Sequence, residues 1–250
     1  MKVLNNKINI VDVKDSEELA RRAFEIFTVS AQNAVSEKDV FCVAISGGKT
    51  PRKFYELLGT DSDAFNMPWN KTELFWVDER FVVPQSPDSN YKLANDTFLK
   101  KISISPRNIH RIMGENNDYA QAVRDYEYAL RQVFNLASGG IPEFDLMVLG
   151  MGPDGHIGSL LPNSYALFDT DDLVTVVYQL EGGLNRITLT HPVMCAARQL
   201  LVMVSGAEKA SIVREVLLGG PDEVKYPVHT LWPILHKVTW LIDSEAAKLL

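Results

Sequence analysis

Short, continuous apolar runs recur along the chain, separated by polar and amphipathic segments. Because these runs are apolar on both faces rather than alternating, they are typical of parallel strands buried on both sides of a sheet. The runs lie at Phe41 to Ile45, Leu74 to Val77, Phe144 to Leu149, Leu173 to Tyr178, Ile187 to Leu189, Leu200 to Val204 and Val238 to Ile242.

Helical patterns lie between these runs. Two segments, Leu19 to Ala34 and Tyr119 to Val133, place their apolar residues on one face at helical spacing. Asp15 with Glu18 predicts a capped start for the first of them. Shorter helices are expected over Pro51 to Leu58, Tyr91 to Leu99 and Glu208 to Leu218.

The alternation of strands and helices predicts an α/β fold with a doubly wound, mostly parallel sheet. Helices should cover both faces of this Rossmann-like sheet and connect its strands by right-handed crossovers. The runs 84–90 and 103–108 are rich in Pro, Ser and Asn and are expected to be loops, but neither resembles a linker. Residues 1–250 should therefore form one domain.

Composition and charge narrow the possible partners. The chain has 250 residues, of which 46% are hydrophobic, so it can bury a full core. Its formal charge of −7 disfavours nucleic acid and anionic membranes, because both attract positive charge. No apolar run is long enough to cross a bilayer, and the first twenty residues do not resemble a signal peptide, so a cytoplasmic location is expected.

The two cysteines, Cys42 and Cys195, lie in apolar stretches without a metal-binding pattern. Such cysteines are usually buried thiols in a reducing compartment. We therefore expect neither a disulfide nor a zinc site.

A turn with three glycines between Gly150 and Gly155 follows the apolar run that ends at Leu149. It places Asp154 and His156 at the end of a predicted strand, where open parallel sheets bind ligands. Asp154 could fix the tautomer of the imidazole and leave its other nitrogen free to take a proton from water. A helix is also expected to start after His156, and its dipole would act on the imidazole together with the charge of the carboxylate.

A second turn, from Ser46 to Pro51, has features of an anion-binding site. Gly47 and Gly48 allow backbone N–H groups to turn inward, and Ser46 and Thr50 add hydroxyl donors at the start of a helix. The spacing matches neither GxGxxG nor GxxxxGK[ST], so these nucleotide-binding motifs are excluded.

Charged residues follow other predicted strands. Asp78-Glu79-Arg80 comes at the end of one strand, Arg186 begins another, and Lys209 lies shortly after a third. These charges could point into the same crevice as the two turns. Without a GxSxG serine or a cysteine beside a base, activation of water by His156 is favoured over a covalent intermediate.

Six segments, in this order and spacing, closely resemble the 6-phosphogluconolactonase family. They are SGGKTP, WVDER, Asn90-Tyr91, GMGPDGHIGSLLP, RITLT and GAEKA. The resemblance extends from about Asp15 to the end of the chain, and GMGxDGHxxSLxP is its most specific part.

The resemblance implies a hydrolase of carbohydrate metabolism. It would convert 6-phospho-D-glucono-1,5-lactone to 6-phospho-D-gluconate in the oxidative pentose phosphate pathway, without a metal or organic cofactor. His156 would be the general base, oriented by Asp154. The substrate and its phosphate would lie near Ser46, Gly47, Gly48, Thr50, Asp78, Arg80, Arg186 and Lys209. We expect a monomer or a weak homodimer.

Two alternative functions stay open. Glucosamine-6-phosphate deaminases share the phosphate loop and the GxDGH core, and in such an enzyme Asp78 would abstract the proton while His156 assisted ring opening. They typically have Ala-Phe-Asn-Glu-Pro after the GxDGHI segment, where this chain has Gly158 to Pro162, and an aromatic residue in place of Arg80. Both differences favour the lactonase. A non-catalytic sugar-phosphate sensor is disfavoured by the intact Asp154 and His156.

The chain also departs from the usual lactonase pattern in two places. Pro162-Asn163-Ser164 stands where Phe-Pro-Gly-Ser is common, and Tyr226 to His229 stand where Leu-Pro-Ala-Ser is common. These differences would affect the rim of the pocket and with it the substrate preference.

Overall fold

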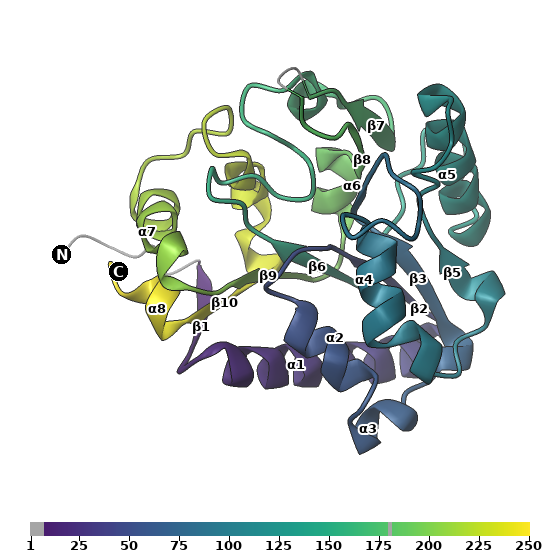
Figure 1. Cartoon of the computed structure of the whole chain (residues 1–250), viewed down its shortest axis with the longest axis horizontal. Helices are drawn as coiled ribbons and strands as arrows, with labels where there is room; N and C mark the ends of the chain where they lie inside the picture. Colours follow the sequence, from purple (N-terminus) through teal and green to yellow (C-terminus); the bar gives the residue numbers. More distant parts are fainter. Residues whose placement is uncertain (1–7, 180–181) are drawn as a thin grey trace.

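A seven-stranded sheet forms the centre of the computed structural model, which describes residues 8–179 and 182–250 (Figure 1). All neighbouring strands in it are parallel. Their order across the sheet is β1 (Asn9–Val13), β10 (Val238–Asp243), β9 (Leu200–Val204), β6 (Leu146–Gly150), β2 (Phe41–Ile45), β3 (Thr72–Trp76) and β5 (Ile109–His110). The predicted α/β fold with a mostly parallel sheet is thus confirmed.

The central strands follow from their apolar sequences. Every residue of β2 and β9 is buried, and both strands have the predicted bounds. Burial on both faces removes all of their apolar surface from water, which is why the sequence shows no alternation. The two edge strands β1 and β5 were not predicted, because only Val13 of β1 is buried and β5 has only two residues.

Helices cover both faces of this sheet. In Figure 1, α1 and α2 lie below the sheet, whereas α5, α6 and α7 lie above it. The Asp15 carboxylate accepts hydrogen bonds from the backbone N–H groups of Glu17 and Glu18, as its capping role predicted. The helices are α1 (Ser16–Lys38), α2 (Arg52–Leu58), α3 (Ser62–Phe65), α4 (Asn90–Thr97), α5 (Tyr119–Val133), α6 (His191–Ala196), α7 (Ala210–Leu218) and α8 (Ser244–Ala247).

Three short strands form a second sheet, which corrects part of the prediction. β4 (Asp78–Arg80), β8 (Arg186–Leu189) and β7 (Val174–Val177) pair in that order, and both pairings are antiparallel. The apolar runs of β7 and β8 were expected in the parallel sheet, because burial gives the same pattern in either sheet. The Asp78–Arg80 segment was expected to be the end of a strand, but it pairs with β8 instead.

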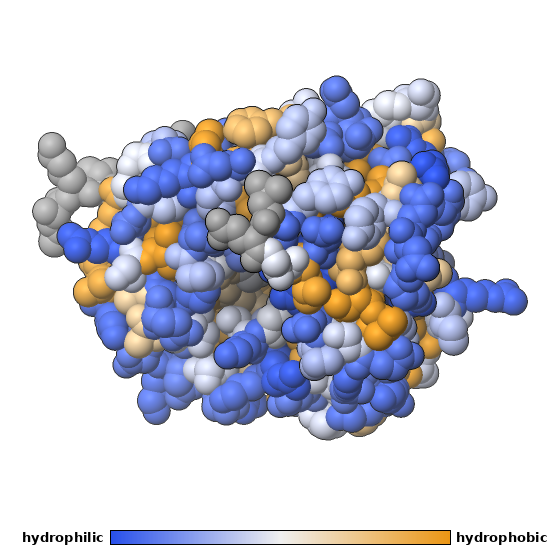
Figure 2. All heavy atoms as spheres, turned by 45° about the horizontal axis from the view of Figure 1, so that its top comes forward, coloured by the Kyte–Doolittle hydropathy of each residue, from blue (hydrophilic) through white to orange (hydrophobic). Residues whose placement is uncertain are grey.

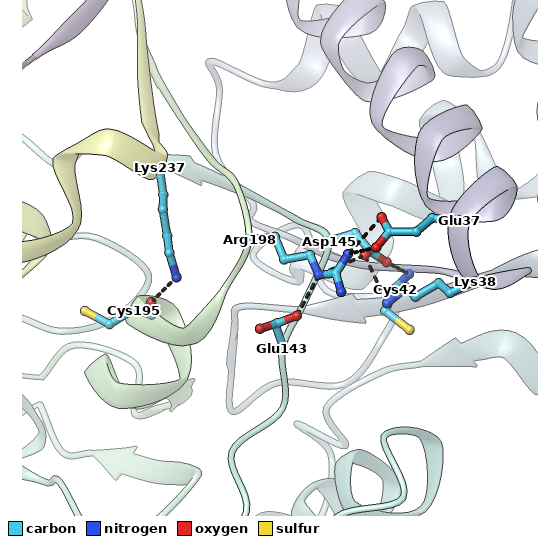
Figure 3. Close-up of polar contacts among 8 residues, drawn as sticks. All are labelled: Glu37, Lys38, Cys42, Glu143, Asp145, Cys195, Arg198 and Lys237. Carbon is cyan, nitrogen blue, oxygen red and sulfur yellow. Dashed lines mark hydrogen bonds and ion pairs between the residues drawn. The ribbon is translucent and has the colours of Figure 1, made fainter.

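At the amino-terminal ends of the strands, Asp145 joins β2 to β6 (Figure 3). Its carboxylate accepts a hydrogen bond of 2.8 Å from the backbone N–H of Cys42 and lies 3.0 Å from the Lys38 ammonium. Both cysteines are free, and Figure 3 shows them well apart. Cys42 is buried as expected, but Cys195 is only half-buried. Burial raises the pKa of the Cys42 thiol to about 12, so this thiol is unreactive.

Hydrophilic side chains cover most of the face shown in Figure 2, and apolar residues appear in small groups between them. No helix in the described part of the chain is long and apolar enough to span a membrane.

The order of the strands reverses between β2 and β6. From β2 the chain proceeds to β3 on one side, whereas from β6 it proceeds through β9 to β10 on the other. The helices on either side of such a switch point diverge and leave a crevice at the carboxyl ends of the two strands. The turns 46–51 and 150–158 follow β2 and β6 directly, so both lie at this crevice.

Candidate active site

A cavity of about 340 Å³ lies at the switch point, a volume within the usual range for small-molecule sites. It is lined by the turns after β2 and β6, by β4 and β8, and by the segment before α7. Nine of the ten predicted site residues line it: Ser46, Gly47, Gly48, Thr50, Asp78, Arg80, His156, Arg186 and Lys209. Asp154, the tenth, holds His156 from outside the lining.

The turn after β6, residues 150–158, which we term the glycine turn, joins Asp154 to His156. Nδ1 of His156 lies 2.6 Å from the Asp154 carboxylate, and the backbone N–H of His156 donates to the same oxygen at 3.3 Å. Gly152 is required here, because a Cβ on it would lie 2.2 Å from Nδ1 of His156 and 2.6 Å from the carboxylate. Gly155 has a φ of 80°, in the left-handed region that favours glycine.

This geometry determines the free nitrogen of the imidazole. Because Nδ1 is bonded to Asp154, Nε2 is left to face a ligand in the cavity that His156 lines. Burial raises the pKa of Asp154, but the hydrogen bonds and charge of His156 more than offset this and hold the pKa below its usual value. The expected helix after His156 is absent, since residues 157–164 form turns and isolated β-bridges, so no helix dipole acts on the imidazole from there.

The turn after β2 presents donors to the opposite side of the cavity. The hydroxyl of Ser46 is buried and has no hydrogen-bond partner within the described residues, although it lines the cavity. Gly48 has a φ of 100°, which few other residues adopt. A buried hydroxyl without a partner is costly, so a ligand oxygen here would be stabilising.

Two guanidinium groups come from neighbouring strands of the small sheet. Arg80 and Arg186 are register partners in the antiparallel β4–β8 pair, which brings residues distant in sequence to the same cavity wall. Nη1 of Arg80 donates to the backbone carbonyl of Asp88 at 3.1 Å and to the side chain of Asn90. Nη1 of Arg186 lies 3.3 Å from the hydroxyl of Ser159.

Lys209 adds an ammonium group from the end of a short 3₁₀ turn, Ala207–Lys209, that precedes α7. Its Nζ donates to the backbone carbonyl of Met151 at 2.9 Å, which ties it to the glycine turn. Burial lowers the pKa values of both Lys209 and Arg186. These cations have lost part of their hydration, so a bound anion would compensate for that loss.

Asp78, by contrast, already accepts hydrogen bonds from neighbouring side chains. It is nearly buried, and its two oxygens accept hydrogen bonds from the Ser159 hydroxyl at 2.7 Å and from the Asn90 amide at 3.2 Å. Asp78 thus holds the cavity wall together and balances the charge of the nearby arginines.

Sequence reasoning missed Asn90 as a site residue. Its amide nitrogen donates to the backbone carbonyl of Asp78 at 2.8 Å, its oxygen accepts from Arg80, and it packs against Gly47. The same side chain therefore joins the turn after β2 to β4. Asn90-Tyr91 was one of the segments that resemble the family, but only the fold shows that this segment reaches the cavity.

Glu79 points away from the cavity and fixes α4. Its carboxylate accepts hydrogen bonds from the backbone N–H groups of Arg80, Asn90 and Tyr91, all at 2.8 Å, and from the Ser89 hydroxyl at 2.9 Å. Burial raises the pKa of Glu79, and these hydrogen bonds oppose the rise. Glu79 is thus a structural neighbour of the site, not one of its lining groups.

The chain was compared with known proteins. Residues 14–240 match the model of the family described as glucosamine-6-phosphate isomerases/6-phosphogluconolactonase. The chain belongs to this family. It is 35% identical to 6-phosphogluconolactonases from Nostoc and Synechocystis, covering 93% and 95% of this chain and 94% and 97% of theirs.

Solved structures of the family share the fold. The 6-phosphogluconolactonase of Thermotoga maritima is 27% identical, with a TM-score of 0.78 over 94% of this chain and 99% of that one. A monomeric glucosamine-6-phosphate deaminase is 24% identical, with a TM-score of 0.82 over 97% of this chain and 100% of that one. Fold alone therefore does not separate the two activities within the family, and the site residues must do so.

Proposed function

We propose that the protein hydrolyses 6-phospho-D-glucono-1,5-lactone to 6-phospho-D-gluconate in the oxidative pentose phosphate pathway. The observation that carries this proposal is the cavity that His156, held by Asp154, shares with a set of cations and an unpartnered serine hydroxyl. Such a cavity joins a general base to an anion-binding surface. The identity to named lactonases over most of the chain supports the same activity.

In the proposed reaction, the substrate phosphate binds near Ser46, Gly47, Gly48, Thr50 and Arg80. Arg186 and Lys209 add further positive charge. Backbone N–H groups, hydroxyls and cations are the donors that phosphates prefer in proteins. This anchoring leaves the lactone ring to extend toward the imidazole.

Nε2 of His156 takes a proton from water, whose oxygen attacks the lactone carbonyl carbon. The tetrahedral intermediate then collapses, the ring C–O bond breaks, and the ring oxygen leaves as a hydroxyl after receiving the proton from the imidazolium of His156, which restores the neutral base. The backbone N–H groups of Gly152 and Gly155 already donate within the glycine turn, so a cation of the cavity is the better candidate to stabilise the oxyanion. General-base catalysis of this kind contributes roughly 10²- to 10⁴-fold.

The environment of Asp78 favours hydrolysis over aldose-ketose isomerisation. Each oxygen of Asp78 accepts a hydrogen bond, from Ser159 or from Asn90, and these contacts compete with the abstraction of a proton from a substrate carbon. A deaminase would release ammonia from glucosamine 6-phosphate. We expect none from this protein.

The variant His156→Ala tests the proposed mechanism. It should reduce kcat for freshly prepared lactone by roughly 10²- to 10⁴-fold and leave KM almost unchanged, because the phosphate contacts persist. His236→Ala, which alters a histidine that does not line the cavity, is the matched control and should behave like the wild type. Turnover by His156→Ala close to the wild-type rate, after subtraction of spontaneous hydrolysis, would exclude the mechanism.

The proposal extends to the partners and the location of the protein. A small phosphorylated lactone is its ligand, and neither nucleic acid nor a membrane is expected to bind. We further propose that the protein is cytoplasmic and acts as a monomer or weak homodimer, since each chain carries all residues of the proposed site.

A further inference from the structure

The segment 222–229 packs against the glycine turn without lining the cavity. The backbone N–H of Val228 donates to the carbonyl of Gly155 at 2.9 Å, and a Cβ on Gly155 would lie 3.1 Å from the ring of Tyr226. The backbone carbonyl of Val224 accepts from Asn163 at 3.3 Å, beyond the other end of the turn. The departure from the family pattern at Tyr226 to His229 therefore lies behind the site rather than at its rim.

His229 organises this segment. Its side chain is fully buried and is bonded at both ring nitrogens. Nδ1 lies 2.8 Å from the backbone N–H of Asp222, and Nε2 lies 3.0 Å from the carbonyl of Val216 in α7. Nδ1 is also 3.2 Å from the carbonyl of Asp222, but its shorter contact is to the N–H group. These partners assign the neutral tautomer in which Nδ1 accepts and Nε2 donates.

Aromatic side chains next to His229 also keep its imidazole in this position. The imidazole packs edge-on against the rings of Tyr226, 5.6 Å away, and Trp232, 4.2 Å away. The hydroxyl of Tyr226 in turn donates to Glu215 on α7. Tyr226 and His229 are thus both fastened to α7, and Tyr226 and Val228 are the residues that contact Gly155.

We propose that His229 is a positioning residue for the hydrolysis assigned above, and the inference rests on that proposed function. His229 holds residues 222–229 in one conformation, and this segment holds Gly155. Because Asp154 and His156 flank Gly155 in the chain, a displacement of Gly155 moves both members of the hydrogen-bonded pair. A shift of about 1 Å in a reacting group can reduce the rate on the order of 10²-fold.

Three variants test this inference. His229→Leu keeps most of the side-chain volume but removes both hydrogen bonds, whereas His229→Gln offers one donor and one acceptor and should restore them. Leu19→Ala is the control for lost stability, because Leu19 is buried in α1 outside the site. All variants are compared with the wild type at a temperature well below their unfolding transitions.

We expect His229→Leu to lower kcat by roughly 10- to 100-fold while KM changes less than about threefold, because the phosphate contacts are not disturbed. His229→Gln should recover most of this loss, and Leu19→Ala should keep the wild-type kcat despite its lower stability. A kcat for His229→Leu equal to that of Leu19→Ala would overturn the proposal. If His229→Leu does not fold, Tyr226→Ala, which removes the ring against Gly155, must show the same loss of kcat.

A second measurement needs no substrate and is therefore independent of the proposed function. The proton NMR signal of the imidazole N–H between His156 and Asp154 should lie at low field in the wild type and in His229→Gln. We expect it to shift or broaden in His229→Leu. An unchanged N–H signal in His229→Leu would overturn the positioning role even if lactone hydrolysis is established. By contrast, lactone hydrolysis that persists at the wild-type rate in His156→Ala would refute the proposed function and not the positioning role.

Discussion

Asp154 acts on the imidazole of His156 through a contact of 2.6 Å, so its charge and its geometry both matter. An asparagine at this position would present either a neutral oxygen or an N–H group to Nδ1. In the second case the imidazole would have to turn its acceptor toward the amide and its proton toward the ligand, which is the wrong tautomer for a base.

We therefore expect Asp154→Asn to lower kcat on the order of 10²-fold or more, with little change in KM. Its effect on stability should depend on pH. The pKa of Asp154 is lowered in the folded state, so its contribution is complete above the unfolded value of about 3.9 and is lost as the pH falls through the lower folded value. Urea unfolding of the wild type and of Asp154→Asn at pH 7 and near pH 2 would measure this contribution. If the two proteins differ by the same free energy of unfolding at both pH values, the expectation is contradicted.

At the scale of single residues, sequence reasoning identified the side chains whose partners are close in the chain. Asp154 and His156 are two residues apart, so their interaction could be predicted from spacing. Asn90 and Ser159 were missed because they meet Asp78 only through contacts 12 and 81 residues away in sequence. No local pattern indicates such contacts.

At the scale of elements, the glycine turn depends on a position without a side chain. A Cβ on Gly152 would fall within 2.6 Å of both Asp154 and His156, so Gly152→Ala should separate the pair and lower kcat roughly 10²-fold while the fold persists. Gly220→Ala is the matched control, because its Cβ would meet nothing within 4 Å. Steady-state kinetics and circular dichroism would test this, and wild-type kcat in Gly152→Ala would refute the argument.

The small antiparallel sheet shows why some elements were assigned to the wrong sheet. β7 and β8 are short and apolar, and their sequence contains no information about the direction of their neighbours. β8 pairs with β4 more than one hundred residues earlier, and this pairing brings Arg186 beside Arg80. Both arginines line the same cavity, although the strand arrangement that brings them there differs from the predicted one.

At the scale of the whole molecule, an acidic protein carries a cationic cavity. The formal charge is −7, but the cavity is lined by four cationic and two acidic side chains: Lys49, Arg80, Arg186 and Lys209 against Asp78 and Glu208. The surrounding negative charge should repel phosphorylated ligands at long range, whereas the local field attracts them once they enter. The affinity for phosphorylated ligands should thus depend on the cationic side chains that line the cavity and not on the net charge of the protein.

The product should consequently stabilise the protein through its phosphate. At a concentration of 6-phosphogluconate 100 times Kd, the free energy of unfolding should rise by about 2.7 kcal/mol, because the ligand binds the folded state alone. Thermal unfolding with and without ligand would measure this. Gluconate without the phosphate should give little shift, and Arg80→Ala should weaken the effect of 6-phosphogluconate. Equal stabilisation by the two ligands would argue against a phosphate site.

The pairing of β2 with β6 has a consequence for the size of the substrate. The two strands are direct neighbours, from Val43 beside Leu146 to Ile45 beside Val148, and neighbouring strands lie about 4.8 Å apart. One strand leads into the turn proposed to bind the phosphate and the other into the glycine turn, so backbone hydrogen bonds between the strands fix the distance between the two turns. The spacing of the two strands therefore selects ligands by the distance between their phosphate and carbonyl groups. A molecule with too few atoms between these groups would bind without reaching the imidazole.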